Sequence, residues 1–431
     1  MYDYGIENGY VYLENEFHLM NVYISGEKIA LVTTDRQSCR EALDVKGKYV
    51  LPGFIDPHVH FALGVGDKVS KDDFREGSME AALGGVTTYI DFLDPVKIAE
   101  DISTEFEKRD KMASNSIIDY AFHTTIANPS DSAETIIKAG LDVGINSVKL
   151  FTTYADTDRR TYDNYIYSLL EESGQLGARI VIHAENDDLI CHDSDILIKD
   201  HSKARPVISE NVEVMKLAQM AKKACGNLYI VHVSAGSSVK LLDYNFKEEI
   251  KNNQIILESC PHYFLINDSV LNNDDGYKYT MTPPLRPEID RQLLDEYVDS
   301  IYTIGTDHCP YTREQKKNIY TSETPMGIGG IRYTFLNMYN KYGFDILDKY
   351  TINPAKAYGL EFKGSLLPGM DADITIFDKD STTIVEDDMS VYFMKELNGK
   401  IDMVLSRGKV CMKQGKCSLT QGKYIARKSL K

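Results

Sequence analysis

Eight short apolar segments, separated by stretches of helical periodicity, constrain the fold of this chain more than any other feature. Each segment is rich in β-branched residues and almost continuously apolar, as parallel strands are when both faces of their sheet are covered. The expected strands are residues 49–56, 86–92, 119–126, 147–151, 179–184, 228–233, 255–259 and 302–306. The expected helices include residues 76–83, 133–139, 165–172 and 210–224.

Eight strand–helix units in about 260 residues are typical of an α/β protein built as a (β/α)8 TIM barrel. A doubly wound parallel sheet is the alternative, and eight parallel strands do not exclude it. Residues 1–50 instead contain short alternating strands and turns, and the same style returns after residue 363. We therefore predict an accessory β-sandwich built from both chain ends. The predicted boundaries are 1–50 and 364–431 for the sandwich and 51–363 for the barrel. We expect the basic residues 425–431 to be a frayed terminus rather than a contact with another subunit.

Charge and cysteine content limit the partners and the location of this protein. The formal net charge of −17 disfavours nucleic acid and anionic membrane surfaces, because both attract basic proteins. Seven cysteines without a Cys-x-x-Cys pair indicate a reduced protein with neither a disulfide framework nor a thiolate zinc site. The acidic N-terminus lacks an apolar signal core, and no apolar run approaches the roughly 20 residues of a membrane span. We expect a cytoplasmic protein with neither nucleic acid nor a membrane as its partner.

Polar side chains interrupt the apolar segments at one end, where barrel strands carry their chemistry. A single His-x-His pair such as His58 and His60 is a weak signal, because both could be ordinary histidines at a strand end. The later strands add His183, His232 and Asp307 at the same relative position. Imidazole is the commonest protein metal ligand, and four histidines with one aspartate at one barrel end predict a metal site.

Lys149 ends the fourth strand, pointing toward the same site. Burial and nearby cations both lower the pKa of a lysine, and a neutral amine can take up CO2 to form a carbamate that bridges two metals. From the residue alone, we would interpret Lys149 as an anchor for a substrate carboxylate or as a lysine at the barrel rim.

The motifs together resemble those of the cyclic amidohydrolases in the amidohydrolase superfamily, on the dihydropyrimidinase and hydantoinase branch, over essentially the whole chain. They are Pro-Gly-Phe-Ile-Asp-Pro-His58-Val-His60, Lys149-Leu-Phe-Thr-Thr-Tyr154, His183-Ala-Glu-Asn, Ile-Val-His232-Val-Ser-Ala, Glu258-Ser-Cys-Pro-His-Tyr, Tyr279-Thr-Met-Thr-Pro-Pro-Leu-Arg286 and Gly305-Thr-Asp307-His-Cys-Pro. The resemblance implies two Zn²⁺ per subunit. One would be bound by His58, His60 and Asp307, the other by His183 and His232, with N6-carboxylated Lys149 bridging them.

The resemblance also implies the reaction, in which a metal-bridging hydroxide attacks the ring amide of a cyclic ureide, either a 5,6-dihydropyrimidine or a hydantoin. Asp307 would take the hydroxide proton and hand it to the leaving nitrogen. Tyr154 would donate a hydrogen bond to the oxyanion, although a merely packed aromatic would also fit its position. Backbone groups at Thr282 and around Met326 match the positions where the family holds the ring.

Allantoinase and dihydroorotase are the alternative activities. Dihydroorotases usually have an arginine directly after the His-x-His pair, where this chain has Phe61. Allantoinases usually lack the tyrosine that Tyr154 matches. Three departures leave the natural substrate open: residues 61–66 lack the usual Pro-Phe, Thr282 replaces a usual serine, and Met326 replaces a usual asparagine.

A different class is also open, because some relatives have lost their metal ligands and act as non-enzymatic scaffolds. All six ligand positions are filled here, which argues against that role. The family suggests a homotetramer, or a dimer. Among the other histidines, His123 could support a ligand, and His262 and His308 could orient ligands or simply pack. We expect the remaining three at the surface: His18, His192 and His201.

Overall fold

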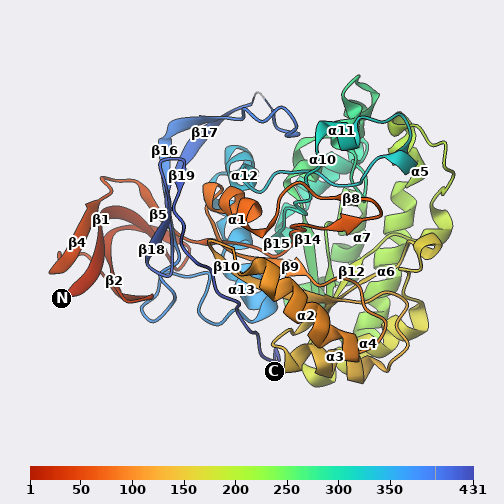
Figure 1. Ribbon diagram of the computed structural model, residues 1–431, viewed down its shortest axis with the longest axis horizontal. Helices are drawn as coiled ribbons and strands as arrows, with labels where there is room; N and C mark the ends of the chain where they lie inside the picture. Colours follow the sequence, from red (N-terminus) through yellow and green to blue (C-terminus); the bar gives the residue numbers. More distant parts are fainter. Residues whose placement is uncertain (394) are drawn as a thin grey trace.

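The computed structural model describes residues 1–393 and 395–431, which form a closed barrel beside a large sheet (Figure 1). The barrel strands pair in parallel in the order β15-β14-β13-β12-β11-β10-β9-β6. Their bounds are β6 Phe54–Asp56, β9 Val86–Phe92, β10 Asp119–Thr125, β11 Ser147–Phe151, β12 Arg179–His183, β13 Leu228–Ile230, β14 Ile255–Ser259 and β15 Thr303–Ile304. All eight lie within or coincide with the predicted strands.

The first and last barrel strands meet just beyond their carboxyl ends. The amide of Asp307 donates to the carbonyl of His58 at 3.0 Å, and the amide of His60 donates to the carbonyl of His308 at 2.9 Å. Val59 and His308 form an isolated parallel bridge at the same point. An open doubly wound sheet has no such contact between its edge strands, so the fold is the predicted (β/α)8 barrel.

Helices surround the barrel in the order that the periodicity predicts. The longer ones are α1 Phe74–Leu83, α2 Glu100–Ala113, α3 Ala133–Asp142, α4 Asp163–Leu176, α6 Val207–Ala224, α7 Gly236–Asn245, α10 Glu288–Glu296, α12 Thr334–Tyr342 and α13 Ile352–Tyr358. The shorter ones are α5 His201–Ala204, α8 Lys247–Lys251, α9 Pro261–Leu265 and α11 Arg313–Lys316. The side chain of Asp73 caps α1 by accepting from two backbone amides, at Arg75 and Glu76, which satisfies donors that have no partner inside the helix.

The predicted strand at residues 49–56 serves both parts of the molecule. Its first half, β5 (Tyr49–Pro52), belongs to the large sheet, and its second half, β6, belongs to the barrel. The division falls at Gly53, where a Cβ atom would lie 2.2 Å from the hydroxyl of Thr87. Only glycine lets the chain pass this close to β9.

Both chain ends build the large sheet, as predicted, and its strands are joined into one nine-stranded sheet. The order is β19-β18-β17-β16-β5-β1-β2-β3, with β4 paired to β1. The bounds are β1 Tyr2–Leu13, β2 Glu16–Ser25, β3 Lys28–Thr33, β4 Cys39–Asp44, β16 Ile374–Ile384, β17 Glu396–Ser406, β18 Lys409–Lys413 and β19 Lys416–Cys417. One apolar cluster unites residues of both ends, including Val22, Val50 and Leu405. A separate two-stranded hairpin comprises β7 Gly64–Val65 and β8 Lys68–Val69.

A buried charge cluster joins the sheet to the barrel. The ammonium of Lys363 donates to Asp119 and Asp373 at 2.6 Å each and lies 3.0 Å from Asp371. Asp119 begins β10, whereas Asp373 immediately precedes β16. These three carboxylates lie close enough to one another to hold a cation. The ammonium of Lys363 is that cation.

Residues 425–431 are bound to the barrel, so the prediction of a frayed terminus is wrong. The amides of Ile425, Arg427 and Leu430 donate to carbonyls of Tyr120, Gly144 and Gly177 at 2.7–2.8 Å. These carbonyls lie at or before the amino ends of β10, β11 and β12, opposite the predicted site. Backbone groups and the buried side chain of Arg427, which donates to the carbonyl of Phe122, therefore hold this segment.

All seven cysteines are free. Across residues 1–393 and 395–431, the helices are too short or too polar for any of them to cross a membrane.

Candidate metal centre and active site

His58, His60 and Asp307 converge at the carboxyl end of the barrel. The carboxylate oxygen Oδ1 of Asp307 lies 3.2 Å from His58 Nε2 and 3.1 Å from His60 Nε2. The two imidazole nitrogens are 3.2 Å apart. The three predicted residues therefore lie together, because the loops that follow β6 and β15 are hydrogen-bonded to each other.

His183 and His232 form a second pair beside the first group. His183 Nδ1 lies 3.1 Å from His232 Nε2, and the ring centroids of His58 and His232 are 5.4 Å apart. Both His232 and Asp307 adopt positive φ angles, 39° and 50°. Residues other than glycine rarely adopt this backbone conformation, and such strain concentrates at functional sites.

Buried carboxylates orient one histidine of each group. Glu258 accepts from His58 Nδ1 at 2.8 Å, and Glu185 accepts from His183 Nε2 at 2.7 Å. Both glutamates are fully buried. Each carboxylate holds one ring N–H, so the other ring nitrogen faces the centre of the site, where a neutral imidazole would offer its lone pair.

The donor set fits divalent transition metals. Four imidazoles and one carboxylate, all buried or nearly so, are ligands that suit Zn²⁺. Burial lowers the pKa of His60, His183 and His232, which favours the neutral imidazole that binds metal. At His58, burial opposes protonation, but the Glu258 and Asp307 carboxylates outweigh it and raise the pKa to about 9. Those carboxylates therefore favour positive charge at this point.

Lys149 lies inside the barrel next to these ligands. It is 1% exposed, and its Nζ lies 5.4 Å and 5.3 Å from the ring centroids of Phe92 and Phe151. Burial lowers its pKa to about 8, against the attraction of Asp307 and Glu258. Its charge also lowers the pKa of His183 and His232, after burial and other groups, so the lysine is close to the second pair.

Tyr154 and Thr282 are also brought together, 128 residues apart in the chain. The phenol and hydroxyl oxygens lie 2.8 Å apart, and the Tyr154 ring centroid is 5.5 Å from that of His183. Tyr154 has a positive φ of 69°, and Asp187 holds this turn by accepting from its amide at 2.9 Å. Burial raises the pKa of Tyr154, so the phenol stays protonated and able to donate.

Met326 lies on a segment that is hydrogen-bonded to the segment of Thr282. The amide of Gly327 donates to the carbonyl of Thr280 at 3.1 Å. Among the described residues, the backbone N–H and C=O groups of Thr282 and Met326 make no hydrogen bond. Four N–H and C=O groups on two adjoining segments therefore have no hydrogen-bond partner among the described residues.

The sequence interpretation missed a charged network behind His183. Arg205 donates to Glu185 through three contacts of 2.6–3.2 Å. Arg286 lies 3.3 Å from Glu210 and 3.9 Å from Glu185. Arg205 and His183 together outweigh burial and hold the pKa of Glu185 well below its usual range. Glu185, two residues after His183, was the one local signal for this network.

The structure corrects the prediction for His201. Its side chain is 3% exposed rather than at the surface, and its Nε2 donates to the carbonyl of Met281 at 2.9 Å. His18 is exposed, and the His192 side chain is 38% exposed. The other three histidines outside the metal site, His123, His262 and His308, are all buried.

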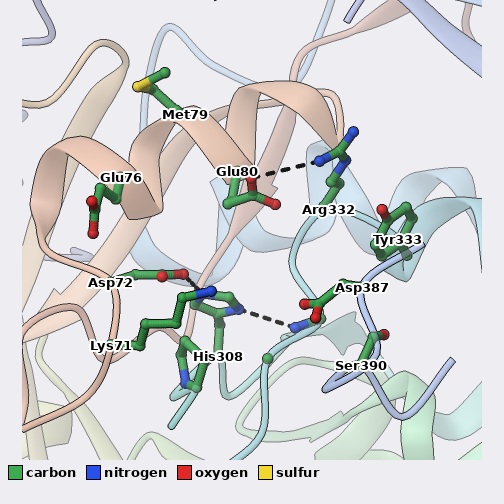
Figure 2. Close-up of a pocket in the computed structure, with 13 residues that line it drawn as sticks. Lys71, Asp72, Glu76, Met79, Glu80, His308, Arg332, Tyr333, Asp387 and Ser390 are labelled. Atoms are coloured by element: carbon green, nitrogen blue, oxygen red, sulfur yellow. Dashed lines mark hydrogen bonds and ion pairs between the residues drawn. The ribbon is translucent and has the colours of Figure 1, made fainter. Parts of the chain in front are cut away.

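A pocket of about 420 Å³ lies behind the loop that carries Asp307. Figure 2 shows His308 at its base, held between Asp72 and the amide of Gly330, with α1 running above and Glu80 paired to Arg332. His308 therefore anchors the loop next to Asp307 from outside the metal site.

Comparisons with known proteins agree with this geometry. Residues 49–411 match the family described as the amidohydrolase family. The chain is 31% identical over 400 residues to a D-hydantoinase of Geobacillus stearothermophilus, covering 86% of this chain and 83% of that one. It is 26% identical to a D-hydantoinase of Ralstonia pickettii over the full length of both. The crystal structure of a dihydropyrimidinase from Brevibacillus agri superposes with a TM-score of 0.91 at 26% identity, over 100% of this chain and 99% of that one.

Proposed function

Because this chain belongs to the amidohydrolase family, on its hydantoinase and dihydropyrimidinase branch, we propose that it hydrolyses the ring amide of a cyclic ureide. The substrate would be a 5,6-dihydropyrimidine or a hydantoin. The observation that carries the proposal is the meeting of His58, His60 and Asp307 with His183 and His232 at the carboxyl end of a closed barrel.

The metals are proposed to be two Zn²⁺ ions. His58, His60 and Asp307 would hold one, and His183 and His232 the other. When bound, two such ions polarise a carbonyl and supply a nucleophilic water near neutral pH. We further propose that Lys149 carries a carbamate that bridges them. Its nitrogen would form a bond to the carbon of CO2 and release one proton, and a pKa near 8 supports a reactive neutral fraction.

The remaining roles belong to side chains and peptide groups of the chain. A cyclic ureide alternates N–H donors and C=O acceptors around its ring, and the free peptide groups of Thr282 and Met326 offer the complementary pattern. The Tyr154 phenol would donate to the carbonyl oxygen as negative charge develops on it. Asp307 would accept a proton at its carboxylate and return it to the ring nitrogen as the C–N bond breaks.

Two alternative activities fit the surroundings less well. A dihydroorotase would need a basic group for the substrate carboxylate directly after the histidine pair, where Phe61 is fully buried and packs against Phe74 and Tyr89. For an allantoinase, the tyrosine at position 154 would be unusual. A non-enzymatic scaffold would not retain all six ligands. Thr282 and Met326 still leave the ring substituent open.

We keep three further expectations as proposals: domain boundaries at residues 50 and 363, a homotetramer or dimer, and a cytoplasmic location. Seven free cysteines support the last. The formal net charge of −17 supports the expected lack of nucleic acid and membrane partners.

The test is metal content of the purified protein together with hydrolysis of dihydrouracil, hydantoin, allantoin and dihydroorotate. We expect about two zinc ions per chain and turnover of dihydrouracil or hydantoin, since two ligand groups are present. The Lys149→Ala variant should lose metal and activity, and short carboxylic acids should restore part of both. Turnover of allantoin or dihydroorotate alone would overturn the substrate assignment. A protein with neither metal nor turnover would leave the scaffold interpretation.

A further inference from the structure

Lys316 is a buried cation whose partners are backbone carbonyls. It ends the short helix α11, is 2% exposed, and donates to the carbonyls of Thr280 at 2.8 Å and Gly327 at 2.6 Å. Within the described residues, no carboxylate forms an ion pair with it. Burying a charge without a counter-charge is costly, so the two carbonyls are the groups that hold this side chain in place.

Both acceptors lie on the two segments that carry free peptide groups, residues 280–282 and 325–327. The same two residues also bond each other, through the amide of Gly327 and the carbonyl of Thr280. Lys316 thus joins the two segments. It contacts one segment at Thr280, which precedes Met281, and the other at Gly327, which follows Met326. The backbone N–H and C=O groups of Thr282 and Met326, on the two joined segments, have no hydrogen-bond partner among the described residues.

Other contacts also hold each of the two segments in place. His201 holds the carbonyl of Met281, and Tyr154 contacts the hydroxyl of Thr282. A Cβ atom at Gly327 would lie 2.5 Å from the carbonyl of Cys309, two residues after Asp307. Each segment is anchored to the catalytic end of the barrel, and Lys316 bridges the two beside their direct hydrogen bond.

We propose that Lys316 is a positioning residue for substrate, which fixes the spacing of the two segments whose free peptide groups receive the ureide ring. The inference rests on the proposed function and deepens it, because it assigns ring recognition to a junction outside the metal site. Burial lowers the pKa of Lys316 to about 7. Since an ammonium has three donors and a neutral amine two, both forms can make both hydrogen bonds.

The test compares Lys316→Met, Lys316→Arg and Lys349→Met with the wild type, all loaded with metal. Lys349 is the matched control: it is also buried, its pKa is lowered to about 8 by burial, and it donates to the carbonyl of Ile301 before β15, at the opposite end of the barrel. Steady-state kinetics with hydantoin or dihydrouracil would be combined with hydrogen–deuterium exchange of peptides covering residues 277–285 and 323–329.

We expect Lys316→Met to raise KM about tenfold with kcat changed less than about threefold, because one or two weakened hydrogen bonds to the ring cost about that much in binding. Exchange should become at least about tenfold faster in both peptides. Lys316→Arg should recover most of the KM and the protection, and Lys349→Met should change neither.

Two failures can be told apart. An active wild type with unchanged KM and unchanged exchange in Lys316→Met would overturn this inference and leave the proposed function standing. Equal changes in Lys316→Met and Lys349→Met would also overturn it, because a general loss of stability would then explain both. A wild type that hydrolyses no cyclic ureide would overturn the proposed function and, with it, the role of Lys316 in substrate binding, whatever the exchange data show.

Discussion

Replacing Arg205 with methionine should destabilise the protein and weaken metal binding at once. Glu185 is fully buried, and Arg205, itself 8% exposed, supplies its main counter-charge through contacts of 2.6, 3.1 and 3.2 Å. Methionine preserves much of the apolar stem and removes the guanidinium. The carboxylate then keeps only His183 and the distant Arg286, whose nitrogen is 3.9 Å away.

The magnitude follows from burial. Breaking a buried ion pair by removing one partner costs about 3–5 kcal/mol, because the remaining charge is left without compensation. Arg286 retains part of the favourable field, so we expect the lower end, about 3 kcal/mol. The pKa of Glu185 should rise at the same time, since Arg205 is the strongest group that lowers it. A protonated Glu185 would accept from His183 more weakly than the carboxylate does, and metal affinity should fall about 10–100-fold.

The assay is a double-mutant cycle of Arg205→Met and Glu185→Gln. Apparent free energies of unfolding would come from urea titrations of the metal-free protein, and metal affinities from competition with a chelator. The double variant should be less destabilised than the sum of the single ones by at least about 1 kcal/mol, since the second change removes the stranded charge. Lys138→Met is the control: its pair with Glu134 is exposed, and no measurable change is expected. Strictly additive costs in the cycle would refute the reasoning.

Three further variants test separate parts of the structure. Tyr154→Phe should lower kcat about 100-fold with little change in KM, if its phenol stabilises the developing oxyanion; an equal change in KM alone would contradict this. Burial lowers the pKa of His201 to about 4, so between pH 6.5 and 4 the unfolded chain binds a proton that the folded protein does not. This contribution to stability is present above pH 6.5 and falls by about 3 kcal/mol on acidification to pH 4; His201→Gln should flatten the measured slope of unfolding free energy against pH by about one proton. Lys363→Met should leave Asp373 without its cation, while Asp119 keeps Arg407 at 3.3 Å, and should cost about 3 kcal/mol in urea titrations; unchanged stability would show that the cluster is protonated or hydrated instead.

The barrel was predictable because its evidence is local. A parallel strand covered on both faces needs an apolar run, and the run is visible without knowing its neighbours. The same holds for His58, His60, His183, His232 and Asp307, because each follows such a run and parallel strands end together.

The features that were missed depend on contacts between distant residues. The break at Gly53 follows from Thr87, which lies on another strand. The burial of His201 depends on the carbonyl of Met281, 80 residues away, and the sequence around His201 is polar. Arg205 lies twenty residues from its partner Glu185, and no periodicity links the two.

Residues 425–431 were misjudged for a related reason. Their side chains are basic, and a basic segment at the surface usually remains solvated. Their order comes from backbone amides that pair with carbonyls near the amino ends of β10, β11 and β12, and from the buried Arg427 side chain, which donates to the carbonyl of Phe122. Side-chain composition carries no information about such pairing.

The position of β5 between β1 and β16 has a consequence for biosynthesis. The N-terminal strands emerge from the ribosome first, yet one neighbour of β5 lies more than 320 residues later, at Ile374–Phe377. Residues 425–430 must then reach the amino ends of three barrel strands that were synthesised far earlier. The chain therefore cannot complete its folding domain by domain as it is made. Loop closure over such separations is slow, so nascent chains should depend on protection of the early strands until residues beyond 400 are available.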